Sequence, residues 1–89
     1  MHEGARPRRA TGIVEETIND TLVLTVPSSE TVHTLNATAT FIFAACDGTQ
    51  TLEAIVSAVA TRYGVPADRV AGDVIATIAQ LVTKGLILS

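Results

Sequence analysis

Residues 21–36, TLVLTVPSSETVHTLN, contain two short runs rich in Val, Thr and Leu, a composition typical of β-strands. In the first run Leu22, Leu24 and Val26 would lie on one face, while the residues between them would lie on the other. Pro27-Ser28-Ser29 separates the runs and is typical of a turn. We therefore predict strands at residues 21–26 and 31–35 that cover a core with one face only.

The residues on either side extend this pattern. Residues 13–18 are rich in β-branched side chains, and Asn19-Asp20 suits a two-residue hairpin because both residues tolerate positive φ. Asn36 is a good N-cap, and apolar residues at helical spacing follow it up to the Asp-Gly pair at 47–48. Two further helices are predicted, from Thr51 to Gly64 and from Pro66 to about Lys84. The expected fold class is α+β, a three-stranded antiparallel sheet followed by three helices, with residues 86–88 docked back on the core.

Length and charge limit the organisation of the chain. Its 89 residues suffice for one domain, which we expect at residues 12–89, after a disordered tail at residues 1–11 that contains Gly, Pro and three Arg. Beyond that tail, three basic side chains stand against eight acidic ones, a net charge of -5 that repels phosphate backbones. The sequence has neither a membrane-spanning run nor a secretory signal, so we expect a cytoplasmic protein without membrane partners.

The chemically reactive residues form no recognisable catalytic or metal-binding pattern. His2 and His33 are far apart, and no Cys or paired carboxylate stands at metal-ligand spacing around either. Cys46 lies where a helix ends, beside Asp47, and both features disfavour a thiolate. We therefore expect no catalytic residues, no metal and no cofactor, a half-packed His33 and a buried or half-buried Cys46.

The third predicted strand has an unprotected edge. In a simple meander it would leave one row of amides and carbonyls unpaired, and Val32-His33-Thr34-Leu35 carries no Lys or Pro to guard them. Such an edge beside a helix can take up an extended peptide as an additional strand. The sequence alone thus favours a peptide-binding surface over a catalytic pocket.

Several motifs, in this order, resemble the PqqD-like family over about residues 13–88: the strand end at residues 32–36, Cys46-Asp47-Gly48, Tyr63-Gly64-Val65 and Lys84-Gly85-Leu86-Ile87. This sequence departs from the family in having Phe41-Ile42-Phe43 where an Ile-Trp pair is common. The resemblance implies a winged-helix-like domain that binds the leader segment of a ribosomally made, post-translationally modified peptide and presents it to a modifying enzyme. That enzyme would be a radical-type oxidase or a lasso-peptide leader protease.

In such domains the leader lies along the third strand and against the third helix. The resemblance therefore implies a peptide site at Val32, His33, Thr34, Leu35, Arg69, Val70, Asp73, Val74 and Thr77. It leaves open which of the helix residues face the peptide and which face the core.

Two other functions were weighed against this one. A winged-helix DNA-binding regulator would share the elements, but its recognition helix normally carries several basic residues, whereas the third helix here has Arg69 between Asp68 and Asp73. It stays the alternative. A carrier domain would need an exposed serine at a helix start, and Ser57 lies inside a predicted helix.

Overall fold

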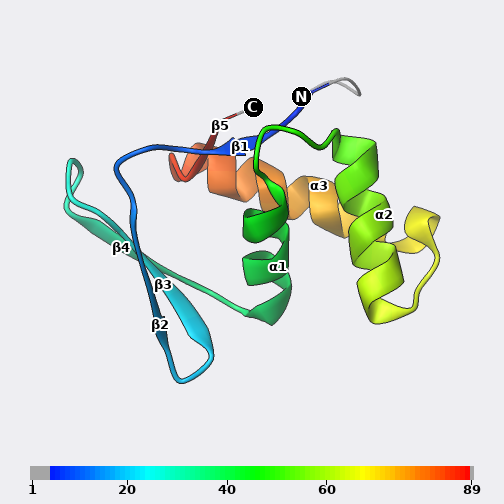
Figure 1. Ribbon diagram of the computed structural model, residues 1–89, viewed down its shortest axis with the longest axis horizontal. Coiled ribbons are helices and arrows are strands. Elements are labelled where there is room, and N and C mark those ends of the chain that lie inside the picture. Colours follow the sequence, from blue (N-terminus) through cyan, green and yellow to red (C-terminus); the bar gives the residue numbers. More distant parts are fainter. Residues whose placement is uncertain (1–4, 89) are drawn as a thin grey trace.

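The sheet of the computed structural model, which describes residues 5–88, is a three-stranded antiparallel meander. Its strands are β2 (Val14–Ile18), β3 (Thr21–Val26) and β4 (Thr31–Leu35), in the order β2-β3-β4 (Figure 1). Asn19 and Asp20 join β2 to β3 with φ values of 51° and 64°, the left-handed pair that a tight two-residue hairpin requires. The predicted sheet and its first turn are therefore confirmed.

Three helices follow the sheet: α1 (Ala37–Ala45), α2 (Leu52–Tyr63) and α3 (Ala67–Thr83). Asn36 caps α1 by accepting a hydrogen bond of 2.8 Å from the Ala39 amide, and Thr51 caps α2 in the same way. Gly64 ends α2 in the left-handed conformation that glycine adopts without strain. The α+β class and the positions of all three helices are as predicted, with α3 beginning directly after Pro66.

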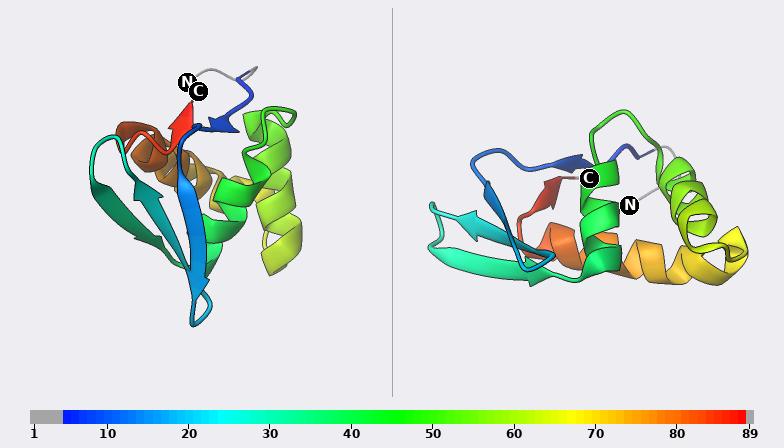
Figure 2. Two further views of the ribbon diagram at one scale, coloured as in Figure 1. Left: turned by 60° about the vertical axis from the view of Figure 1, so that its left-hand side comes forward. Right: turned by 60° about the horizontal axis from the view of Figure 1, so that its bottom comes forward.

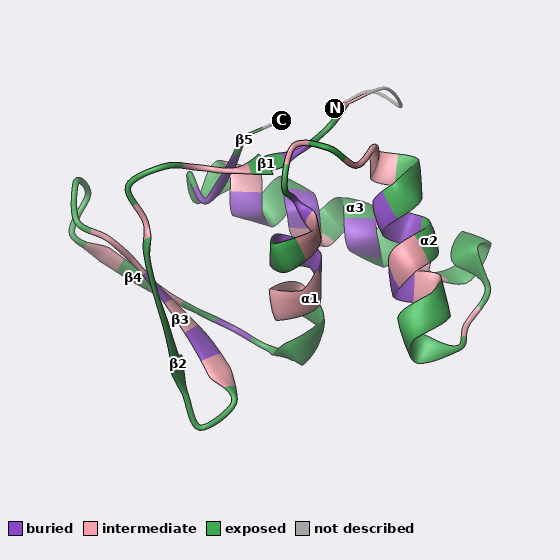
Figure 3. Cartoon of the chain, in the orientation of Figure 1, coloured by how far each residue is buried: buried purple, intermediate pink, exposed green. Residues whose placement is uncertain are grey.

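The core lies where α1 meets the inner face of the sheet and the other two helices. Figure 1 shows α1 between the sheet and α2, with α3 crossing behind both helices, and the right-hand view of Figure 2 shows α3 running below them. The alternation in β3 decides which face is inner, since Leu22 and Leu24 are buried and β2 is exposed throughout (Figure 3). The buried apolar residues are Leu22, Leu24, Leu35, Ile42, Phe43, Cys46, Ile55, Val56, Val59, Val74, Ile78, Leu81, Leu86 and Ile87.

A second, two-stranded sheet joins the two ends of the domain. Strand β1 (Arg8–Arg9) pairs antiparallel with β5 (Ile87–Leu88), and Pro7 is buried beside it. For residues 5–11 the expectation of a disordered tail is therefore wrong, because backbone hydrogen bonds tie this segment to Cys46, Gly48, Leu52 and Leu86. Residues 1–4 of that expected tail lie outside the described residues. The predicted docking of residues 86–88 is confirmed for Leu86 and Ile87, which are buried, whereas Leu88 is exposed.

The side chain of Arg9 closes the C-terminal end of α1. Its Nη1 donates hydrogen bonds to the carbonyl oxygens of Ala44, at 2.7 Å, and Phe43, at 3.3 Å. The guanidinium also lies 5.9 Å from the centre of the Phe43 ring. A cation is favourable there because the last carbonyls of a helix carry partial negative charge and lack partners within the helix.

Replacing Arg9 by alanine should therefore lower the free energy of unfolding by about 1–2 kcal/mol, the range for charged hydrogen bonds at a helix end. Urea denaturation followed by circular dichroism measures this loss. The control is Arg6→Ala, an exposed arginine on the same segment, which should change stability by less than about 0.5 kcal/mol. Equal effects of the two substitutions would contradict the role of Arg9.

Within residues 5–88, none of the helices has both the length and the apolar character that crossing a membrane requires.

Candidate peptide-binding site

The register of the sheet identifies which groups on β4 are free. In a two-residue hairpin the residues that flank the turn, here Ile18 and Thr21, exchange hydrogen bonds. Alternation then directs the backbone of Leu22, Leu24 and Val26 toward β4, where their partners are Leu35, His33 and Thr31. The amides and carbonyls of the two residues between those partners, Val32 and Thr34, therefore face the open edge.

The four candidate residues on β4 consequently differ in what they can offer. Val32 and Thr34 are exposed, and their backbone groups point outward. His33 is half-buried, and its Nε2 lies 3.3 Å from the Thr31 hydroxyl, which fits the predicted packed histidine. Leu35 is a core residue, only 4% exposed. A peptide strand at this edge would thus pair chiefly with Val32 and Thr34.

A cavity of about 240 Å³ lies where the three helices meet, and it contains four of the five candidates on α3. Val70, Asp73, Val74 and Thr77 share one helix face at spacings of three and four, and all four line the cavity. Arg69 does not line it. We call this space the three-helix cavity; its lining residues are Thr38, Ile42, Val59, Tyr63, Val65, Val70, Asp73, Val74 and Thr77.

The first turn of α1 connects the open edge of β4 to this cavity. None of the four β4 candidates lines the cavity, but Thr38 does, and it follows Leu35 by three positions. An extended peptide advances about 3.3 Å per residue, so a strand paired with Val32 and Thr34 needs only a few more residues to pass the start of α1. The edge and the cavity can therefore act on one peptide.

The chemistry of the cavity suits an apolar side chain. Its walls are mostly aliphatic, and Asp73 is the charged residue among those that line it. At the rim, Tyr63 is 44% exposed and stacks edge-on against Phe41 with ring centres 6.3 Å apart, while the Arg62 guanidinium lies 6.0 Å from the Phe41 ring. These contacts fix an aromatic edge at the mouth of the cavity.

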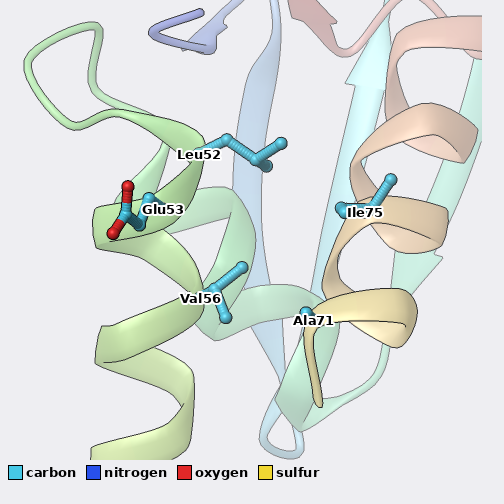
Figure 4. A pocket seen from close by; sticks show the side chains of 5 residues that line it. All are labelled: Leu52, Glu53, Val56, Ala71 and Ile75. Carbon is cyan, nitrogen blue, oxygen red and sulfur yellow. The ribbon is translucent and has the colours of Figure 1, made fainter. Parts of the chain in front are cut away.

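A larger groove, of about 380 Å³, lies on another side of α3. Leu52 and Val56 of α2 face Ala71 and Ile75 of α3 across it (Figure 4). None of the predicted site residues lines this groove, and neither does any residue of the sheet. We therefore place the candidate site at the three-helix cavity, which adjoins the open strand edge.

The comparisons with known proteins identify the family and the fold. The pattern of the family described as coenzyme PQQ synthesis protein D, PqqD, matches residues 21–87, which include β3, β4 and all three helices. The chain belongs to the PqqD family. No curated protein matched it.

Two solved structures share this PqqD fold. The first shows TbiB1 in complex with the TbiA(beta) leader peptide; it is 25% identical, has a TM-score of 0.78, and the match covers 90% of this chain and 93% of that one. The second is a lasso peptide synthetase B1 complexed with the leader peptide, 21% identical with a TM-score of 0.82, covering 96% and 100% of the two chains. Both proteins thus bind leader peptides with the same arrangement of elements.

Five residues of the cavity were not among the predicted site residues. Ile42 and Val59, which are also buried core residues, form part of the apolar wall, and Thr38, Tyr63 and Val65 complete the lining. The i, i+4 pairs Thr38–Ile42 and Val59–Tyr63 are the signal in the sequence, because each pair shares one helix face. These faces of α1 and α2 form one wall of the cavity only when the two helices pack together in the folded domain.

The residues outside this site offer little reactivity. Within residues 5–88 there is no group of three or more His, Cys, Asp or Glu that could hold a metal ion. Cys46 is buried, as predicted, and the pKa of its thiol is raised to about 11. Burial is the main cause, while Arg9 lowers the pKa and Asp47 raises it by smaller amounts. Hydrogen bonds from Thr49 lower the pKa of Asp47 itself, which keeps that carboxylate charged beside the thiol.

We therefore expect Cys46 in the folded protein to react with iodoacetamide at pH 8 about a hundredfold more slowly than in urea, since two pKa units separate the thiolate populations. The pKa of this thiol is about 11 in the folded protein and about 9 in the unfolded protein. Its contribution to the free energy of unfolding is therefore fully present below pH 9 and is lost as pH rises from 9 toward 11. Alkylation followed by mass spectrometry measures the rates. Equal rates in folded and unfolded protein would contradict the burial of this thiol.

Proposed function

We propose that this chain is a non-catalytic adaptor that binds the leader segment of a ribosomally made precursor peptide and presents it to a modifying enzyme. The leader adds as a fourth strand along β4 and inserts an apolar side chain into the three-helix cavity. The proposed contacts are the outward backbone groups of Val32 and Thr34, beside His33, and the cavity residues Val70, Asp73, Val74 and Thr77. Of the other predicted site residues, Leu35 holds β4 on the core and Arg69 lies outside the cavity. The enzyme is an oxidase of the radical type or a lasso-peptide leader protease, and the adaptor acts in the cytoplasm.

The observation that carries the proposal is an open strand edge that leads into an apolar cavity. Each of Val32 and Thr34 offers one donor and one acceptor in the direction away from β3. These groups bind the backbone of a peptide without regard to its sequence, whereas the cavity selects one of its side chains. The combination suits a partner recognised by a short motif in an extended segment.

The electrostatics favour a peptide over nucleic acid. The exposed start of α3 presents Arg69 between Asp68 and Asp73, and Asp73 reaches the cavity. A helix that enters a DNA groove must neutralise phosphates, and two carboxylates beside one arginine oppose that. Asp73 is instead well placed to pair with a polar or basic group of a peptide at the mouth of the cavity.

Calorimetric titration with the leader peptide encoded beside this chain's gene tests the proposal. An interface of four or five paired residues and one anchored side chain predicts a dissociation constant between tens of nanomolar and micromolar. A scrambled leader of the same composition is the control. No saturable binding of the leader, together with binding of duplex DNA at physiological salt, would favour the winged-helix regulator instead.

A further inference from the structure

The outer face of the sheet is uncovered. The residues that share it are Val14, Glu16, Ile18, Thr21, Val23, Thr25, Val32 and Thr34, and the register places them in cross-strand rows such as Val14–Thr25–Val32. Helix α1 packs against β3 and β4 on the opposite face, and no helix lies over the outer face (Figures 1 and 3). Val14, Ile18 and Val32 are 56%, 48% and 62% exposed. We call this surface the outer face.

The outer face has an acidic border and no basic residue near it in the sequence. Glu16 lies on the face, Asp20 lies in the turn at one end, and Glu30 lies in the turn at the other end. Between Ala10 and Thr61 the chain contains neither Lys nor Arg. The exposed apolar side chains, Val14, Ile18 and Val32, lie on the two edge strands, and Glu16 lies in the row between Val14 and Ile18. Such a face complements a surface on which apolar and basic side chains are mixed.

This charge pattern decides among the partners that could cover the face. A second copy of the chain would bring acidic borders together, which is unfavourable. A nucleic acid or an anionic membrane would meet the same repulsion. A protein with Lys or Arg among apolar side chains meets neither obstacle, and it would cover the exposed valine and isoleucine side chains.

We infer that the outer face docks the modifying enzyme, through a patch of that enzyme on which apolar and basic side chains are mixed. The inference rests on the proposed function, because a leader added along β4 would extend the same sheet by one strand. Alternate side chains of that strand would then stand on the outer face beside Val32 and Thr34. The enzyme would thus contact one continuous surface made by the adaptor and the leader together.

The size of the surface predicts how strongly it binds. Four strands spaced about 4.8 Å apart and about 17–20 Å long give a face of roughly 350 Å², which is small for a stable complex. Docking should therefore be transient, and the leader should strengthen it by completing the surface. We expect the enzyme to bind the leader-loaded adaptor at least about tenfold more tightly than the free adaptor.

The test uses the modifying enzyme encoded beside this chain, with the full-length adaptor loaded with leader. Glu16→Lys reverses the charge on the outer face and should weaken enzyme binding about tenfold in biolayer interferometry. Ile18→Ser, which removes an exposed apolar side chain, should weaken it as well. Neither residue belongs to the leader site, so calorimetry should give the same leader affinity for both variants as for the wild type.

Glu53→Lys is the matched control, since it makes the same change in net charge on α2, outside the sheet. It should alter enzyme binding less than about twofold. The inference is overturned by equal effects of Glu16→Lys and Glu53→Lys, by wild-type enzyme affinity in Glu16→Lys, or by dimers of the wild type that Ile18→Ser dissociates. If the wild type does not bind the leader at all, the proposed function is refuted instead. Failure of the proposed function and failure of this inference are thus distinguishable.

Discussion

Replacing Val32 by proline is expected to weaken leader binding about a hundredfold or more while leaving the domain folded. Val32 directs its amide toward the open edge, so proline removes a donor that the leader would use and places a ring where its backbone would lie. A lost hydrogen bond that leaves its acceptor unpaired costs about 1–3 kcal/mol, and the ring adds steric exclusion. Calorimetric titration with the leader measures the change.

The opposite edge of the same sheet offers a matched control. Thr17 lies on β2, and alternation from the Ile18–Thr21 pair directs its amide away from β3. Thr17→Pro therefore makes the equivalent change on an exposed edge strand, where proline is tolerated, and should leave leader affinity within about twofold of the wild type. Unchanged leader binding by a folded Val32→Pro variant would refute strand addition at β4.

Replacing Thr77 by phenylalanine should weaken leader binding about ten- to a hundredfold. Thr77 is half-buried in the wall of the three-helix cavity, and the larger ring would occupy space that the leader's apolar side chain needs. Anchoring side chains in such pockets commonly contribute about 2 kcal/mol or more to binding. Because the cavity is empty of protein atoms, the substitution should not lower the stability of the free domain.

Thr83→Phe makes the same substitution on the same helix at an exposed position outside the cavity. It should retain the affinity of the wild type. Thermal unfolding of both variants separates loss of binding from loss of fold. Tight leader binding by a folded Thr77→Phe variant would show that the leader does not use the cavity.

Local patterns in the sequence were sufficient for the main sheet and the helices. The alternation from Thr21 to Val26 is strict, and burial of Leu22 and Leu24 selects the inner face just as the pattern predicts. Asn36 and Thr51 accept the amide hydrogen bonds expected of N-caps. Each of these features depends on residues close together in the chain, which is why the sequence alone could specify them.

The ordered N-terminal segment could not be predicted in this way. Arg8 and Arg9 form a strand because Ile87 and Leu88 lie beside them, about 80 positions later in the chain. Two residues are too few for any periodicity, and the basic composition suggested a solvated tail. The roles of Pro7 in the core and of Arg9 at the end of α1 depend on that distant pairing.

The candidate site could be predicted in part. The open edge followed from the order of the strands, and the resemblance to the PqqD-like family supplied Val70 and Val74, which line the cavity. The contributions of Tyr63 and Val65 depend on how α2 turns into α3 at Gly64, a tertiary feature without a local signal. That only one face of the sheet covers the core, and that the outer face stays open, followed from the period of two in residues 21–26.

Amide hydrogen exchange measured by NMR, residue by residue, tests strand addition most directly. In the free domain the amides of Thr31, His33 and Leu35 should be protected by β3, whereas those of Val32 and Thr34 should exchange fast. The leader should slow exchange at Val32 and Thr34, while the outward amides of Glu15 and Thr17 on β2 stay fast. If the amides of Val32 and Thr34 exchange as fast at saturating leader as in the free domain, binding of the leader along β4 is contradicted.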